Sequence, residues 1–248
     1  MSGLVCRLIF DPPGSGAWNM AVDEALLHGA AAGRPTLRFY TWREATLSLG
    51  YFQGWQTCAA YVSGGELGVV RRPTGGSAIV HGSDLSYALA LGARAAGQGG
   101  IAALYRAVHQ ALVQALARLG VSATLAAVGA RGADARAAGL CMAAISSGDV
   151  LMGGVKIAGS AQRRRGPAVL QHGSVLLRPS ACGVQPPGIA GMGGPALEPM
   201  ALAGVWSLYM AEVLGLAFQA AGLEPAERQT AVRLERERYL STAWTQRR

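Results

Sequence analysis

Three strand patterns joined by glycine turns constrain the fold of this 248-residue chain more than any other feature. Residues 149–152 and 155–161 flank Gly153-Gly154, and paired glycines supply the positive φ angles that a tight hairpin turn needs. A further apolar strand pattern follows at residues 168–177. Strands that follow one another this closely predict a β-sheet that contains hairpins.

The rest of the chain mixes helix and strand patterns. Apolar residues at helical spacing predict helices at 17–29, 101–119 and 200–222, and a charged helix is expected at 225–240. β-Branched and aromatic residues predict strands at 36–42, 46–52, 67–72, 77–81, 85–91 and 121–127, and glycine and proline predict a long loop at 179–199. The pattern indicates an α+β fold, with a mixed sheet and packed helices. We expect a main domain at 1–195 and a C-terminal helical segment, 196–248, packed on it.

Lys156 is the single lysine among 22 basic residues, and all the others are arginine. A flat guanidinium does not replace a compact ammonium at every site, so a lysine kept in this chain is a candidate for chemistry. The alternative is chance survival on a solvated strand. Lys156, Ser160 and Gln162 have even spacing, which predicts one side of a strand, and His172 follows on the next strand.

The segment RRPTGGSAIVH, residues 71–81, is a second candidate site. Gly75 and Gly76 lie between two strand patterns, where glycine lets the backbone approach a ligand closely. Arg71 and Arg72 would bind an anion such as a phosphate or a carboxylate. The alternative is an ordinary glycine turn with exposed arginines.

The cysteines are Cys6, Cys58, Cys141 and Cys182, and no two of them form a CxxC pair. A zinc site is therefore not expected. The first residues lack the long apolar core of a signal peptide, which favours a reducing cytoplasm and free thiols.

Cys141 precedes the hairpin that presents Lys156. A nearby cation would lower the pKa of its thiol by about one or two units from about 8.5 and favour the nucleophilic thiolate. For the other three cysteines we expect the role of small buried hydrophobic residues.

The formal net charge is +8, which favours acidic partners, either nucleic acid or protein. The arginines are scattered and no stretch resembles a nucleic-acid-binding module, so acidic proteins are favoured. The apolar segment 200–222 carries Glu212 in its middle, which favours a buried helix over a membrane span.

Four segments, taken in this order, resemble the biotin/lipoate protein ligase and octanoyltransferase family. They are SGAWNMAVDEALL, LRFYTWREATLSLGYFQ, LGVVRRPTGGSAIVHGSDLSYAL and GGVKIAGSAQRRRGPAVLQHGSVLL, which together cover most of residues 15–177, and ERYLSTAWTQRR resembles the family's closing segment. The resemblance implies a biotin/lipoate ligase-like catalytic domain at residues 1–195. The chain departs from the family at Met142, Ala143 and Ala144, where an aromatic and an acidic residue are common, and at Ser77 after the glycine turn.

Within this family the chain is most similar to the cysteine-dependent octanoyltransferases that resemble lipoate-protein ligase A. The resemblance implies transfer of octanoate from octanoyl-acyl carrier protein through a Cys141 thioester, without a metal or other cofactor. The acceptor would be a lysine of a lipoyl domain, such as glycine cleavage H protein or a 2-oxoacid dehydrogenase E2. Cys141 and Lys156 would be catalytic. The expected substrate-binding residues are Arg71, Arg72, Gly75, Gly76, His81, Gly159, Ser160, Gln162 and His172.

Other functions stay open at this point. An ATP-dependent lipoate-protein ligase would share the glycine turn and Lys156 but would not need Cys141. An octanoyl amidotransferase acting between lipoyl proteins would use a cysteine and a lysine, with different motifs around the glycine turn. A non-catalytic binding protein would let Cys141 and Lys156 vary without loss of activity.

Overall fold

The structure is a computed structural model that describes residues 4–58, 61, 67–92, 100–130, 142, 144–180 and 185–247. Its large sheet comprises β1 (Leu4–Phe10), β2 (Thr36–Tyr40), β6 (Asp84–Gly92), β7 (Thr124–Leu125), β8 (Val150–Met152), β9 (Val155–Arg165), β10 (Ala168–Leu176) and β11 (Leu216–Ala220). A small sheet comprises β3 (Thr46–Leu49), β4 (Gly68–Arg71) and β5 (Ile79–His81). The strand orders are β11-β1-β2-β6-β10-β9-β8-β7 and β4-β3-β5.

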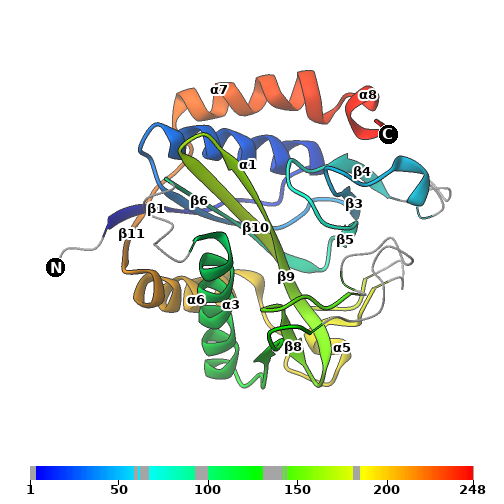
Figure 1. Cartoon of the computed structure of the whole chain (residues 1–248), viewed down its shortest axis with the longest axis vertical. Helices are drawn as coiled ribbons and strands as arrows, with labels where there is room; N and C mark the ends of the chain where they lie inside the picture. Colours follow the sequence, from blue (N-terminus) through cyan, green and yellow to red (C-terminus); the bar gives the residue numbers. More distant parts are fainter. Residues whose placement is uncertain are drawn as a thin grey trace.

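Helices cover both faces of the large sheet (Figure 1). They are α1 (Gly16–Ala31), α3 (Gly100–Arg118), α5 (Gly188–Gly191), α6 (Pro199–Leu214), α7 (Pro225–Leu234) and α8 (Thr242–Thr245), with the short turns η1 (Trp55–Thr57) and η3 (Glu235–Tyr239). The mixed sheet and packed helices confirm the predicted α+β fold. The hairpin predicted around Gly153-Gly154 is confirmed as β8–β9, because Met152 pairs with Val155 in an antiparallel register, and β9 pairs with β10 in the same way.

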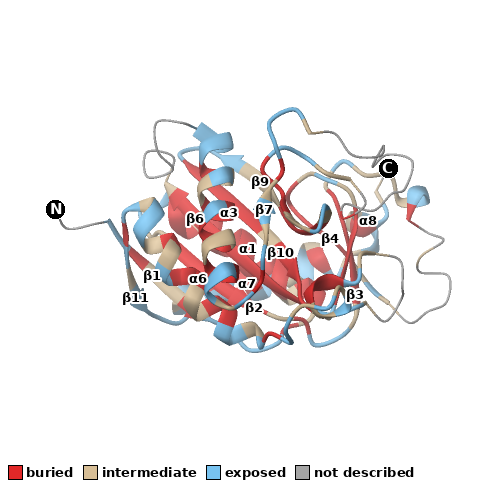
Figure 2. Cartoon of the chain, turned by 90° about the horizontal axis from the view of Figure 1, so that it is seen from below, coloured by how far each residue is buried: buried red, intermediate tan, exposed pale blue. Residues whose placement is uncertain are grey.

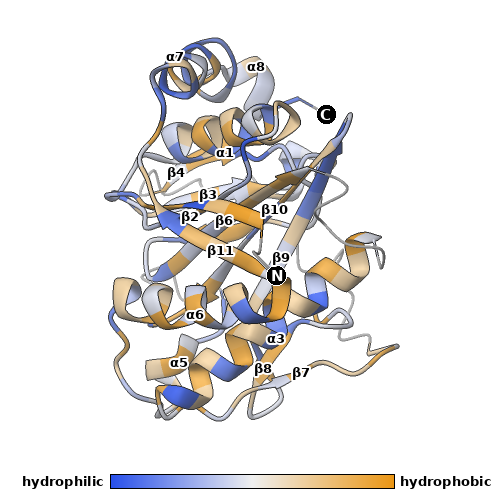
Figure 3. Ribbon diagram, turned by 90° about the vertical axis from the view of Figure 1, so that its left-hand side faces the viewer, coloured by the Kyte–Doolittle hydropathy of each residue, from blue (hydrophilic) through white to orange (hydrophobic). Residues whose placement is uncertain are grey.

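Side chains along the central strands point alternately to two hydrophobic cores, one on each face of the large sheet. Along β6, Leu85, Tyr87 and Leu89 pack with α3 and α6, whereas Ala88 and Ala90 pack with α1. Buried residues therefore line both faces of the sheet and the inner sides of its helices (Figure 2). Figure 3 shows the same layers by hydropathy, with the apolar strands between the helices. Because helices cover both faces of the sheet, the sequences of its central strands are almost continuously apolar.

Helix α1 is enclosed between the sheet and α7, so its polar residues are buried too. Ser15 caps the helix by accepting a hydrogen bond from the amide of Trp18. Asp23 and Glu24 are buried, and both carboxylates are paired with arginines of the protein. Glu24 bonds Arg238 and Tyr239 of η3, which fastens the C-terminal segment to α1.

The predicted helix at 200–222 is wrong after Leu214. Helix α6 ends at Leu214 because Gly215 adopts φ 63°, a left-handed conformation that glycine favours at a helix end. Residues Leu216–Ala220 then form β11, which pairs in parallel with β1. The segment after residue 195 therefore contributes a strand to the large sheet as well as helices. Within the described ranges, no helix is long and apolar enough to cross a membrane.

The small sheet holds the glycine turn against the loop that follows β3. The amide of Tyr51 donates to the carbonyl of Thr74 at 2.8 Å. A methyl group on Gly50 would overlap the carbonyl oxygen of Gly76, so this close backbone approach requires glycine at position 50. The position of the glycine turn thus depends on Gly50, which lies outside the turn.

We expect Gly50→Ala to lower the free energy of unfolding by about 1–3 kcal/mol, because the added methyl group forces the two backbones apart. Thermal unfolding would show this as a drop of several degrees in Tm. Gly54→Ala is the matched control, since Gly54 has φ −65° and its added methyl group would meet nothing closer than 4.0 Å. Equal Tm values for the two variants would contradict this packing argument.

Candidate active site

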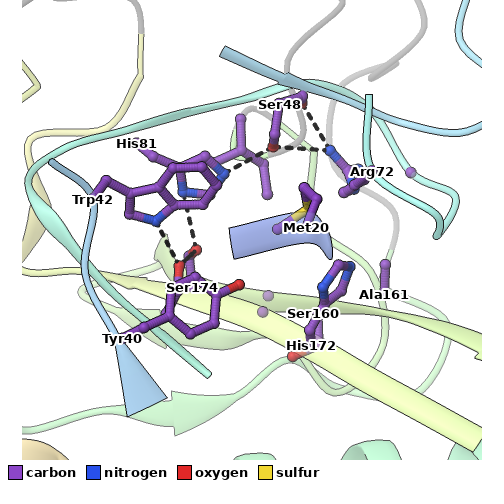
Figure 4. Close-up of a pocket in the computed structure, with 15 residues that line it drawn as sticks. Met20, Tyr40, Trp42, Ser48, Arg72, His81, Ser160, Ala161, His172 and Ser174 are labelled. Atoms are coloured by element: carbon purple, nitrogen blue, oxygen red, sulfur yellow. Dashed lines mark hydrogen bonds between the residues drawn. The ribbon is translucent and has the colours of Figure 1, made fainter. Parts of the chain in front are cut away.

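A cavity of about 430 Å³, its open mouth included, lies between the large sheet, α1 and the small sheet (Figure 4). The residues that line it are Met20, Tyr40, Trp42, Ser48, Arg72, Gly76, Ile79, His81, Ser86, Gly159, Ser160, Ala161, His172, Gly173 and Ser174. Gly76, Ser160, Ala161 and Gly173 are at least partly exposed, which places them at the mouth. Met20, Tyr40, Trp42 and Ser86 are four of the buried lining residues, and we call these four the cavity floor.

The cavity gathers most of the binding residues expected from the sequence. Arg72, Gly76, His81, Gly159, Ser160 and His172 all line it. Arg71, Gly75 and Gln162 are not among its lining residues. The sequence did not identify the four floor residues as part of a site, because they lie in apolar helix and strand patterns that are typical of a hydrophobic core.

His81 stands at the cavity wall with both ring nitrogens engaged. Its Nδ1 lies 2.8 Å from a carboxylate oxygen of Asp84, and its Nε2 lies 2.8 Å from the hydroxyl of Ser48. The ring also stacks on Trp42, with centroids 3.8 Å apart. Burial opposes ionisation of Asp84, but the His81 ring and the amide of Gly82 hold the pKa of this carboxyl below its ordinary value. His81 is therefore fixed in orientation from three sides.

His172 is held in the same way from the opposite wall. Its Nδ1 lies 2.8 Å from Asp23, and its Nε2 lies 2.6 Å from the hydroxyl of Thr74 in the glycine turn. Asp23 also accepts bonds from Arg38 at 2.8 Å and from Tyr40 at 2.9 Å. Burial and the charge of Asp23 together raise the pKa of Tyr40. Because the polar atoms of this wall bond one another, the surface left to a ligand is mostly apolar.

Lys156 is 4% exposed and pairs with a carboxylate that is fully buried. Its Nζ lies 2.8 Å from an oxygen of Asp149 and donates to the carbonyl of Ala144 at 3.0 Å. The hydroxyl of Tyr105 and the amide of Ser146 also donate to Asp149. Asp149 thus joins helix α3, the segment at 144–149 and the lysine of β9.

Lys156 is not among the residues that line the cavity, but its side chain packs against Gly159, which is. A methyl group on Gly159 would lie 2.6 Å from Cε and 2.9 Å from Nζ of Lys156, closer than side chains tolerate. Gly159 also lines the cavity. The ammonium therefore lies behind a buried residue of the cavity wall.

Asp149 was not identified as a site residue from the sequence. It stands at the start of a predicted strand, where a lone aspartate carries no recognisable motif. One argument from the sequence could have identified it. A buried lysine needs a counter-charge, and Asp149 is the acidic residue nearest to Lys156 along the chain.

The side chains of Ser160 and Gln162 lie on the same side of β9, as predicted, and that side faces α3. The hydroxyl of Ser160 bonds Tyr87 and Nε2 of His109. Gln162 donates to the carbonyl of Ile101 at 2.8 Å and to Gln171. The Gln162 side chain therefore lies away from the cavity, and Ser160 lines it without directing its hydroxyl there.

The Ser160 bonds have a fixed direction. Burial lowers the pKa of the His109 imidazole to about 4, so the ring is neutral near pH 7. Its Nδ1 lies 2.6 Å from the carbonyl of Gly148, which only accepts, so Nδ1 carries the proton. Nε2 then accepts from Ser160. This chain of bonds holds Gly148, next to Asp149, in place.

The two arginines of the glycine turn bond backbone carbonyls. Arg71 donates to Gly50 at 2.7 Å, to Gln53 at 2.6 Å and to Thr245 of α8 at 2.8 Å. Arg72 donates to the carbonyls of Ser48, Gly75 and Ser77. Arg71 thus fastens the C-terminal segment to the β3 loop, and Arg72 fixes the turn. Their binding of an anionic substrate stays a prediction. Cys141, the predicted nucleophile, lies outside the described residues.

Comparison with known proteins adds three findings. The model of the lipoyl protein ligase A/B catalytic domain matches residues 15–182. Octanoyltransferase LipM of Kyrpidia tusciae is 39% identical over 179 residues, which are 69% of this chain and 65% of that protein. The same-named protein of Symbiobacterium thermophilum is 41% identical over 172 residues, 65% of this chain and 61% of that protein. The chain thus spans less than two thirds of the length of these relatives.

Solved structures share the fold. A lipoate-protein ligase A bound with ATP matches with a TM-score of 0.79 and 22% identity over 99% of each chain. The bipartite lipoate protein ligase of Thermoplasma acidophilum, described with its E2 lipoyl domain, matches with a TM-score of 0.78 and 21% identity over 98% of this chain and 96% of that chain.

We expect Asp149→Asn to lower the free energy of unfolding by about 3–5 kcal/mol, because it leaves the Lys156 charge buried without its carboxylate. The double variant Asp149→Asn/Lys156→Met removes both charges and should recover part of that loss. Denaturant unfolding measures both. Glu198→Gln is the control, since Glu198 pairs with Arg178 on the surface and its loss should change little. Additive losses in the double variant would contradict a buried ion pair.

Proposed function

The chain belongs to the family of lipoyl protein ligase A/B catalytic domains, and we propose that it is an octanoyltransferase. It would move octanoate from octanoyl-acyl carrier protein to a lysine of a lipoyl domain in the cytoplasm. Relatives named octanoyltransferase LipM, at 39% and 41% identity, support this reaction. The observation that carries the proposal is the buried Lys156–Asp149 pair beside an apolar cavity, directly after the segment that contains Cys141.

The proposed chemistry has two acyl transfers. The Cys141 thiolate attacks the thioester carbonyl of the carrier-bound octanoate, and the carrier thiol leaves with a proton. The neutral amine of the lipoyl-domain lysine then attacks the Cys141 thioester. The carbon–sulfur bond breaks to release the Cys141 thiolate, and the nitrogen loses a proton to solvent as the amide forms. The first transfer exchanges one thioester for another, so it needs no ATP. The amide is more stable than the thioester and drives the second transfer forward.

Lys156 would act on both transfers through its charge. Its ammonium lowers the pKa of the Cys141 thiol and donates to the oxyanion that develops on the thioester carbonyl. Asp149 and the carbonyl of Ala144 fix the position of Nζ before substrate arrives. Donors that are already oriented stabilise a transition state without reorganisation. Asp149 is thus a positioning residue in this proposal.

The neighbours of Cys141 support its role as the nucleophile. Met142 is buried and packs with Ile79, which lines the cavity. The carbonyl of Ala144 accepts from Lys156, and three residues of chain span at most about 10 Å. The other described thiols are poor candidates, because burial raises the pKa of Cys6 to about 12 and also raises that of Cys58.

The charge of the chain supports protein substrates. A net charge of +8 favours acidic partners, and carrier proteins and lipoyl domains of this pathway are typically acidic. Charges at the rim of an interface mainly raise the association rate. Glycine cleavage H protein and a 2-oxoacid dehydrogenase E2 are the proposed acceptors.

An ATP-dependent lipoate-protein ligase is the second candidate function. The fold is shared with a lipoate-protein ligase A whose structure contains ATP, which favours this candidate. Such an enzyme would activate a free acid as an adenylate and would not form a thioester on Cys141.

Incubation with octanoyl-acyl carrier protein in the absence of ATP should add one octanoyl group to the chain, seen by intact mass. The adduct should be absent in Cys141→Ala, which removes the sulfur, and present in Cys58→Ala, which is the matched control. Labelling of a lipoyl domain by free octanoate or lipoate only when ATP is added, without any adduct, would contradict the proposal and favour the ligase.

A further inference from the structure

Met20 is the one flexible side chain in the cavity floor. The other floor groups are held by hydrogen bonds: Tyr40 donates to Asp23 at 2.9 Å, and Trp42 donates to the hydroxyl of Ser86 at 3.0 Å. Met20 is 2% exposed and has an unbranched thioether side chain. Methionine has three rotatable side-chain bonds and adapts to irregular space. Figure 4 shows this side chain projecting from α1 into the cavity.

The cavity has two different ends, a partly exposed mouth and a buried floor. The Lys156 ammonium packs against Gly159, a buried residue of the cavity wall, and the next residue, Ser160, lies at the partly exposed mouth. An acyl group whose carbonyl lies at Lys156 therefore extends inward, and its methyl end points toward the buried floor. The length of chain that fits is then set by the distance from the Gly159 wall to the side chain that closes the floor.

We propose that Met20 determines the acyl-chain length that this cavity accepts, a specificity role that rests on the proposed acyl transfer. Tyr40 and Trp42 close the sides of the floor but cannot move without breaking their bonds to Asp23 and Ser86. The thioether of Met20 is the part of the floor that a mutation changes without breaking a polar contact. Among the described residues, the side chain of Met20 takes part in no hydrogen bond, and its backbone belongs to α1.

The test uses the full chain and measures its acylation by hexanoyl-, octanoyl-, decanoyl- and dodecanoyl-acyl carrier protein. Met20→Ala removes Cγ, Sδ and Cε, and a truncated core residue leaves a cavity because its surroundings collapse only in part. The ratio of kcat/KM for decanoyl over octanoyl transfer should rise by about tenfold or more, since one methylene in an apolar pocket changes kcat/KM by about 10–200-fold. Met20→Leu keeps the volume and should leave the ratio within about twofold.

Met20→Phe supplies the opposite test and also serves if Met20→Ala does not fold. Its larger side chain fills the inner end, so the ratio of hexanoyl over octanoyl transfer should rise. Because every readout is a ratio between substrates on one protein, a general loss of stability does not imitate the effect.

Two results would overturn the proposal and they are distinguishable. If wild-type protein transfers octanoate but both Met20→Ala and Met20→Phe keep its chain-length ratios, the length role of Met20 is wrong and the transferase function stands. If wild-type protein takes no acyl group from any carrier, the proposed function is wrong and the role of Met20 falls with it.

Discussion

The buried ion pair between Lys156 and Asp149 is the interaction on which the candidate site depends. Its two members come from different segments, and a charge this deeply buried is stable only with a partner and further hydrogen bonds. Tyr105 and the amide of Ser146 supply those bonds, which brings α3 and the segment at 144–149 to the start of β9. A side chain at Gly159 would force the end of the Lys156 side chain to shift.

Around this pair, the fold combines a polar scaffold with an apolar ligand surface. Asp23 and Asp84 each hold a histidine of the cavity wall, and Thr74 and Ser48 take the far nitrogens of those rings. The bonds fix the shape of the wall and leave mostly carbon facing inward. An acyl chain suits such a surface, because its burial is favoured by about 0.8 kcal/mol for each methylene. Rigid walls and one adaptable methionine give a cavity of defined length.

The sequence predicted those features that local patterns determine. The β8–β9 hairpin follows from the Gly153-Gly154 turn, and α1 follows from its helical spacing. Strand β11 was not predictable from periodicity, since a short apolar run after an apolar helix reads equally well as either structure. Contacts between distant segments were also out of reach: Asp149 carries no motif, and the carbonyl partners of Arg71 come from positions 50–53 and from the C-terminal segment. Met20 could not be distinguished from other core residues in the sequence, because it is a buried core residue that also lines the cavity.

In the proposed reaction, the Lys156 ammonium lowers the pKa of the Cys141 thiol. The most direct test is the rate of Cys141 alkylation by iodoacetamide as a function of pH, with the labelled peptide resolved by mass. We expect a thiol pKa about one or two units below the ordinary 8.5, and a return toward 8.5 in Lys156→Met. A Cys141 pKa at or above 8.5 in the wild-type protein, unchanged in that variant, would contradict the account.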